Sequence, residues 1–129
     1  MALHYSATCI RMQFQLKDLG GQMFTVIYHY EAEKEVKSLP PNIAAKLSRI
    51  INKLEIDPRQ LREPDTKPLG NGLYEIRTMG RDIARGLWVY QKGERIFLLR
   101  VFIKKTPKTP KSEIELAIQR LEEMLNDKV

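Results

Sequence analysis

Hydrophobic residues recur along most of this chain with the periods of strands and helices. Residues 24–28 are β-branched or aromatic and alternate weakly, which predicts a strand. Apolar residues then recur at helical spacing over 31–39 and over 43–56, and Pro40-Pro41 separates the two segments. The first half of the chain is therefore expected to fold as a strand followed by a helical hairpin.

The second half of the chain reads as three strands and one helix. Residues 58–72 are polar and rich in proline and glycine, which favours a connecting loop. Strands are expected at 73–78, 83–90 and 95–104, and the last is apolar on both faces, as a central strand would be. A final helix is expected to begin at Ser112.

The expected order β-α-α-β-β-β-α predicts an α+β fold, in which a small antiparallel-rich sheet carries the N-terminal helical hairpin on one face. Ser112 and Glu115 have the spacing of a capping box at the start of the C-terminal helix. The apolar stripe of this helix consists of Ile114, Ala117, Ile118, Leu121 and Leu125. We expect this helix to pack beside the sheet, and docking on a partner protein is the alternative.

Residues 1–22 differ from the rest of the chain. They have weak periodicity, a Gly20-Gly21 pair and the only cysteine, Cys9, and they lack the features of a signal peptide. Purine-rich codons for the two glycines would form a ribosome-binding sequence, which would make Met23 the natural start. An ordinary flexible extension is the alternative. We expect a single domain over residues 23–129.

The positive charge of the chain is concentrated in one segment. Residues 73–111 hold ten Lys and Arg against three acids, so this segment carries +7, which exceeds the net charge of +6 for the whole chain. The rest of the chain holds twelve bases and thirteen acids, which gives −1. This segregation favours an anionic partner such as RNA. No apolar run approaches the roughly 20 residues of a membrane span, and a lone cysteine fits a cytoplasmic protein.

Two arginines and a lysine-rich segment form the candidate site. Strand alternation allows Arg77 and Arg85 to share one side of the sheet, and Lys104 and Lys105 follow the last strand. We expect these four cations to converge on a phosphate group and treat them as catalytic candidates.

Ordinary surface salt bridges are the alternative interpretation. Arg77 would then pair with Glu75 or Glu94, and Arg85 would pair with Asp82.

Three further residues are candidates for contact with RNA. Lys108 belongs to the lysine-rich segment, and Arg81 lies in a turn, where simple solvation is the alternative. Trp88 shares a strand face with Tyr90, which suits either core packing or base stacking. Arg100 stands in an otherwise apolar strand and is expected to serve structure.

The residue types exclude several catalytic classes. The sequence has no metal-ligand spacing, no glycine-rich phosphate loop and no credible Ser-His-Asp triad, so neither a metal nor a cofactor is expected. RNA cleavage by attack of the 2′-OH on the adjacent phosphate needs a base for that hydroxyl, an acid for the leaving oxygen and positive charge around the phosphorane. Arginine can stabilise the charged phosphorane, and a lysine among other cations can act as the base.

Three motifs connect the chain to a known family. Residues 67–77, 83–85 and 102–110 read Lys-Pro-Leu-Gly-Asn-Gly-Leu-Tyr-Glu-Ile-Arg, Ile-Ala-Arg and Phe-Ile-Lys-Lys-Thr-Pro-Lys-Thr-Pro. Over about residues 23–125, the chain resembles the HigB-like, phage-derived branch of the RelE/ParE toxin superfamily. The resemblance implies a type II toxin whose fold is similar to microbial ribonucleases. Many such toxins cleave mRNA in the ribosomal A site and are neutralised by a helix-turn-helix antitoxin.

The resemblance also implies roles for individual residues. By position, Arg77 and Arg85 correspond to strand cations that engage the scissile phosphate, and Lys104 and Lys105 to cations at the end of the last strand. Some relatives use a C-terminal tyrosine or nearby histidines. Here no tyrosine follows Tyr90 and no histidine stands near these cations, so the general base is unassigned.

Two other functions stay open at this point. A ParE-like toxin would inhibit another target, such as DNA gyrase, by binding, and a non-catalytic module would only bind RNA. Convergence of the four cations favours an endoribonuclease, because a protein-binding toxin would not need it. The expected partners are mRNA, the ribosome and an antitoxin, with no membrane.

Overall fold

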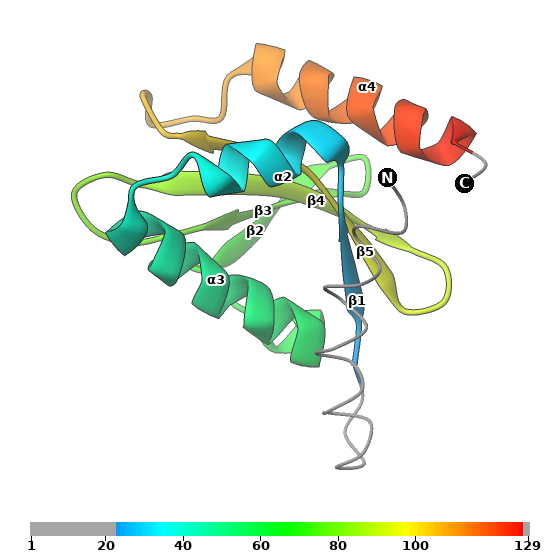
Figure 1. The fold of residues 1–129 in the computed structure, drawn as a ribbon, viewed down its shortest axis with the longest axis horizontal. Helices are drawn as coiled ribbons and strands as arrows, with labels where there is room; N and C mark the ends of the chain where they lie inside the picture. The colour runs from blue at the N-terminus through cyan, green and yellow to red at the C-terminus, as the bar shows by residue number, and fades with distance from the viewer. Residues whose placement is uncertain (1–22, 128–129) are drawn as a thin grey trace.

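The computed structural model describes residues 23–127, which form a five-stranded sheet with helices on both sides (Figure 1). The elements in chain order are β1 (Thr25–Tyr28), α2 (Tyr30–Lys37), α3 (Pro41–Ile56), the 3₁₀ helix η1 (Pro58–Gln60), β2 (Thr66–Gly70), β3 (Leu73–Arg77), β4 (Ala84–Gln91), β5 (Arg95–Ile103) and α4 (Lys111–Asn126). This architecture confirms the α+β fold class. The extension expected at residues 1–22 lies outside the described residues.

The strands of the sheet follow the order β1-β5-β4-β3-β2. β1 runs parallel to β5, and the other neighbours are antiparallel. A parallel pair needs a crossover connection, which α2 and α3 begin and the remaining strands complete. The first strand therefore lies beside the last, and the apolar β5 is an inner strand, as the sequence predicted.

One strand, β2, lies where the sequence predicted only a loop. Pro68 and Gly70 are rare inside strands, but β2 is at the edge of the sheet and pairs only with β3. A proline there loses no hydrogen bond to a second neighbour. The Thr66 hydroxyl donates to the carbonyl oxygen of Glu75 at 2.6 Å and fastens the start of the strand.

The predicted capping box of α4 does not form. The helix begins at Lys111, and Pro110 occupies the N-cap position with no side-chain cap. The carbonyl of Pro110 accepts the N–H of Glu113 at 3.0 Å, so Ser112 lies inside the first turn. Of the helices within residues 23–127, none is long and apolar enough to cross a bilayer.

The two sides of the sheet are covered by different helices (Figure 1). The core on the α3 side contains Phe24, Val26, Leu47, Ile50, Ile51, Leu54, Ile76, Trp88, Ile96, Leu98 and Val101. The core on the α4 side contains Leu73, Leu87, Val89, Phe97, Leu99 and Ala117. Ile114, Leu121 and Met124 also face it. Ile118 and Leu125 are 41% and 55% exposed, so these two members of the predicted apolar stripe do not lie on the buried face. Each is about 100° round the helix axis from the core-facing residue before it, Ala117 or Met124.

α2 covers the part of β5 that extends beyond β1. The carboxylate of Glu35 accepts the N–H of Val101 at 3.0 Å, and Arg120 donates to the carbonyl of Leu99 at 3.0 Å. These side chains therefore form hydrogen bonds with backbone groups of β5 that have no partner strand within the described residues. Glu35 also pairs with Arg100 at 2.6 Å and with Arg120 at 2.9 Å. Burial alone would raise the pKa of Glu35, but these hydrogen bonds and charges lower it overall. Arg100 thus serves structure, as predicted.

Candidate nucleic-acid interface

One end of the sheet gathers the cations predicted from the sequence. At this end β3 stops at Arg77, β4 starts at Ala84 and β5 stops at Ile103. The register places Arg77 directly opposite Arg85, and Arg85 opposite Phe102. Because directly paired residues share a face of the sheet, both arginines lie on the same side.

Arg85 is completely buried and forms an ion pair with Glu75. Both side chains are 0% exposed, and Nη1 of the arginine lies 2.9 Å from Oε2 of the glutamate. Nη1 also donates to Oγ1 of Thr109 at 2.5 Å, and Nη2 donates to the carbonyl oxygen of Pro107 at 2.9 Å. The Thr109 hydroxyl donates to the Glu75 carboxylate. The suggested pairing with Asp82 was therefore wrong, and the guanidinium does not face solvent.

The buried pair anchors residues 104–110, which we name the lysine loop. The N–H of Lys104 donates to the carbonyl of Ile83 at 2.6 Å and fixes the start of the loop, while Arg85 fixes its second half. Within the described residues, Nε of Arg85 and Oε1 of Glu75 are buried without a hydrogen-bond partner. Breaking a buried pair costs about 3–5 kcal/mol, and the hydrogen bonds to Pro107 and Thr109 attach the loop to this stable pair.

Arg77 has a different environment from Arg85. Its side chain is partly exposed, and Nε donates to the carbonyl of Pro64 at 2.8 Å. Among residues 23–127, neither Glu75 nor Glu94 forms a salt bridge with it, so the pairing suggested as an alternative was wrong. A carbonyl carries no net charge, so the positive charge of Arg77 is uncompensated.

The remaining candidates lie in the lysine loop and in the turn between β3 and β4, at the same end of the sheet. Lys104 is partly exposed, and Lys105, Lys108 and Arg81 are exposed. In the described part of the chain none of the four forms an ion pair. We name these four residues and Arg77 the open cations.

Trp88 belongs to the core and not to the surface. It is 1% exposed on the α3 side of the sheet, where its ring stacks on Tyr74 with centroids 4.8 Å apart. A nucleic-acid base cannot reach it, so the prediction of base stacking was wrong. Strand alternation turns Trp88 away from the side that carries Arg85.

A second group of cations on α3 was missed by the sequence reasoning. Lys46, Arg49 and Lys53 line a groove between α3 and the β3–β4 turn. Their spacing of three and four residues places them on one side of the helix, and this signal was readable from the sequence. It was hidden because charge was counted by segment, and α3 belongs to the part of the chain with a net charge of −1.

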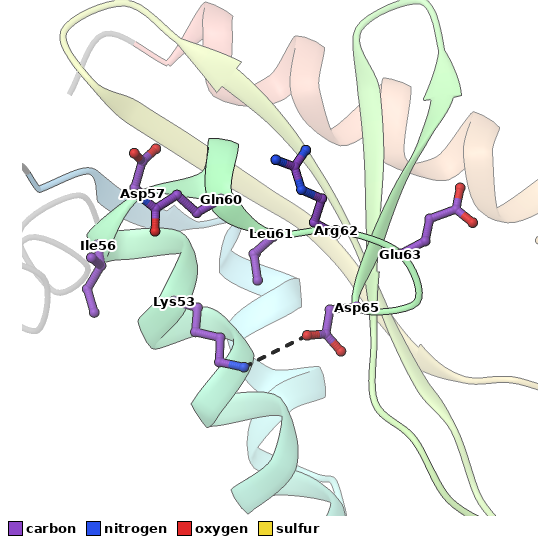
Figure 2. Close-up of a pocket in the computed structure, with 8 residues that line it drawn as sticks. All are labelled: Lys53, Ile56, Asp57, Gln60, Leu61, Arg62, Glu63 and Asp65. Carbon is purple, nitrogen blue, oxygen red and sulfur yellow. Dashed lines mark ion pairs between the residues drawn. The ribbon is translucent and has the colours of Figure 1, made fainter.

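A neighbouring groove carries charges of both signs. It is lined by Lys53, Ile56, Asp57, Gln60, Leu61, Arg62, Glu63 and Asp65 (Figure 2). Lys53 reaches from α3 toward Asp65, with Nζ and Oδ2 3.8 Å apart. A hydrogen bond from the Arg59 side chain lowers the pKa of Asp57. Three carboxylates make this groove a poor site for phosphate.

Comparison with known proteins identifies the family. Residues 34–122 match the family described as "Phage derived protein Gp49-like". A structure of Escherichia coli toxin RelE, an arginine-to-alanine double mutant in the free state, matches with a TM-score of 0.58 at 16% identity, covering 77% of this chain and 98% of that one. No protein of curated function matches the sequence. The chain therefore belongs to the phage-derived Gp49-like family and has the fold of the RelE-like toxins, which confirms the resemblance seen in its motifs.

Proposed function

We propose that the protein is the toxin of a type II toxin–antitoxin pair, that a helix-turn-helix antitoxin neutralises it, and that it cleaves mRNA on the ribosome. The observation that carries the proposal is the group of open cations at one end of the sheet, which have no pairing carboxylate within residues 23–127. A surface with an excess of positive charge attracts a polyanion and positions its phosphates. The RelE-like toxin fold supports the proposal.

The proposed chemistry uses the 2′-hydroxyl of the RNA itself. The 2′-hydroxyl gives up its proton to a base as its oxygen attacks the adjacent phosphorus. The P–O5′ bond breaks and the 5′-oxygen takes up a proton, which leaves a 2′,3′-cyclic phosphate and a 5′-hydroxyl. Negative charge builds up on the phosphorane in the transition state. Arg77 would offer a planar fork of N–H groups to this charge, and Lys104 and Lys105 would offer compact ammonium groups.

Arg85 has a positioning role in this proposal, in place of the direct phosphate contact expected from the sequence. Its guanidinium is 0% exposed and is occupied by Glu75, Thr109 and Pro107. By holding the lysine loop on β4, it would set the positions of the lysine side chains relative to Arg77.

Transcript mapping in cells tests the proposal. After induction of the wild-type protein we expect new mRNA ends that carry 5′-hydroxyls and fall in phase with codons. Lys104→Gln/Lys105→Gln should abolish these ends. Lys92→Gln/Arg95→Gln removes the same charge from the β4–β5 hairpin at the other end of the sheet, and should cleave like the wild type.

Two outcomes would contradict the proposed cleavage. Growth arrest with intact mRNA and a DNA-damage response would favour ParE-like inhibition of DNA gyrase. RNA binding without any new 5′ ends would leave only a non-catalytic RNA-binding module.

A further inference from the structure

We propose that the groove between α3 and the β3–β4 turn, here named the α3 groove, binds the phosphate backbone of a second stretch of the same RNA. The identity of the ligand rests on the proposed function. The groove has a volume of about 460 Å³ and is lined by Lys46, Arg49, Ile50 and Lys53 of the helix, by Thr78–Gly80 of the turn and by Asp65. It lies on the α3 side of the sheet.

The three cations follow one line along the helix. Lys46 and Lys53 are seven residues apart, which corresponds to about 10 Å along the helix axis. This length equals about three nucleotides at a rise of ~3.4 Å per nucleotide in a stacked strand. A row of cations with this length fits consecutive phosphates better than a single small anion.

The three cations differ in their availability. Arg49 is exposed, and its side chain has no hydrogen bond or ion pair within the described residues. Lys46 donates from Nζ to the carbonyl of Met79 at 3.0 Å, and this neutral partner leaves its charge uncompensated. Lys53 lies 3.8 Å from the carboxylate of Asp65 and is partly neutralised. Arg49 and Lys46 are thus the main phosphate ligands in this proposal.

Gly80 allows the turn to lie close against α3. Its φ of +122° is in the region that favours glycine, and a Cβ atom at this position would come within 2.8 Å of Nζ of Lys46. The ammonium group therefore lies against the turn. The α3 groove is preformed, which lowers the entropic cost of binding a ligand.

The α3 groove and the open cations meet at the same end of the sheet. The β3–β4 turn begins at Thr78, which lines the groove, and carries the exposed Arg81. It ends at Ile83, whose carbonyl accepts the N–H of Lys104. One RNA strand can therefore cross the turn with its phosphates held on both sides.

The surroundings of the groove favour RNA over an acidic protein. Protein interfaces are anchored by clusters of apolar and aromatic side chains, and the exposed apolar side chain here is Met79, which is 52% exposed. Asp65 lines both this groove and the mixed-charge groove of Figure 2. Asp57 and Glu63 line the mixed-charge groove beyond Lys53, and these carboxylates would repel phosphate. The RNA path should therefore end near Lys53.

Binding of a non-cleavable RNA tests the proposal. The probe is a labelled 2′-O-methyl oligoribonucleotide of about 12 nucleotides, titrated by fluorescence anisotropy at several salt concentrations. Arg49→Gln should reduce the slope of log K against log salt by about 0.7, the loss expected for one phosphate contact to a single strand. Lys92→Gln makes the same change of charge at the opposite end of the sheet and should leave the slope unchanged.

A second variant should strengthen binding. Asp65→Asn removes the charge that partly neutralises Lys53, so the salt slope should steepen by up to about 0.7 and the affinity should rise. Glu94→Gln removes one exposed carboxylate from the β4–β5 hairpin and should have no such effect. A gain in affinity cannot result from a failure to fold.

The outcomes separate this proposal from the proposed function. Equal salt slopes for Arg49→Gln and Lys92→Gln would overturn the inference, even if mRNA is cleaved. A protein would then be the remaining candidate ligand of the groove. The expected slopes in a protein that cleaves no mRNA would support the inference and contradict only the proposed endonuclease.

Discussion

Arg77 and Arg85 stand opposite each other in adjacent strands, yet their environments differ in every respect. Arg85 is 0% exposed and is neutralised by Glu75, whereas Arg77 is partly exposed and bonded to the neutral carbonyl of Pro64. The difference arises because the lysine loop packs over Arg85 on β4. Arg77 is on β3, whose outer neighbour in the sheet is the edge strand β2. Whether a strand cation can meet a ligand is decided by the carboxylate beside it and the segment above it.

Loss of Arg85 should have the largest effect on stability. Arg85→Met leaves the Glu75 carboxylate buried without a cation, which should reduce the free energy of unfolding by about 3–5 kcal/mol. Arg77→Gln removes one hydrogen bond at a partly exposed site, so the change should stay below about 1 kcal/mol. Urea unfolding of the two variants measures the contrast directly.

The double variant Arg85→Met/Glu75→Leu tests the cause of that effect. Replacing both charges by apolar groups removes the unpaired carboxylate and should recover much of the lost stability. It should not restore mRNA cleavage, because Pro107 and Thr109 lose their anchor. Equal urea midpoints for Arg85→Met and the wild type would mean that the pair is not buried in solution.

The burial of Arg85 could not be predicted from the sequence because it depends on strand register. Glu75 pairs with Leu87 and Arg85 pairs with Arg77, so Glu75 and Arg85 are diagonal neighbours on one face. Strand alternation predicted that the two arginines share a side of the sheet. The ion pair between Glu75 and Arg85 and the course of the lysine loop above it are tertiary features.

Most of the fold was predictable because apolar residues recur at regular spacing over the whole length of the helices and inner strands. β2 was not predictable, because Pro68 and Gly70 are typical of loops and only an edge position tolerates both in a strand. The predicted start of α4 was wrong, because serine is common both at the N-cap and in the first turn of a helix. In the structure Pro110 occupies the N-cap position and Ser112 lies in the first turn. Arg49 was overlooked because charge was counted by segment, and α3 belongs to the part of the chain with a net charge of −1.

Glu55 is a buried acid that, unlike Glu75, has no cation beside it among residues 23–127, and its expected effect on stability is smaller. It is 5% exposed, but no cation pairs with its carboxylate in the described part of the chain, and burial raises its pKa from 4.5 to about 7. At pH values between 4.5 and about 7, the Glu55 carboxyl group holds a proton in the native state and has released it in the unfolded state. Stability should therefore fall as the pH rises through this range.

Urea unfolding of the wild type and Glu55→Gln at pH values near 5 and near 8 checks this prediction. The wild type should lose about 1–2 kcal/mol more than the variant, after allowance for residual hydration of the carboxyl group. An identical pH response in both proteins would show that Glu55 is solvated in the native state.

The central claim is that the open cations, and not the buried arginine, act on the RNA phosphate. The most direct test is the single-turnover rate of mRNA cleavage on programmed ribosomes by Arg77→Gln, measured beside its urea unfolding. We predict that the rate falls by about 10²–10³-fold while the urea midpoint stays near that of the wild type, and that Lys92→Gln cleaves normally. Cleavage by Arg77→Gln at the wild-type rate would contradict the account.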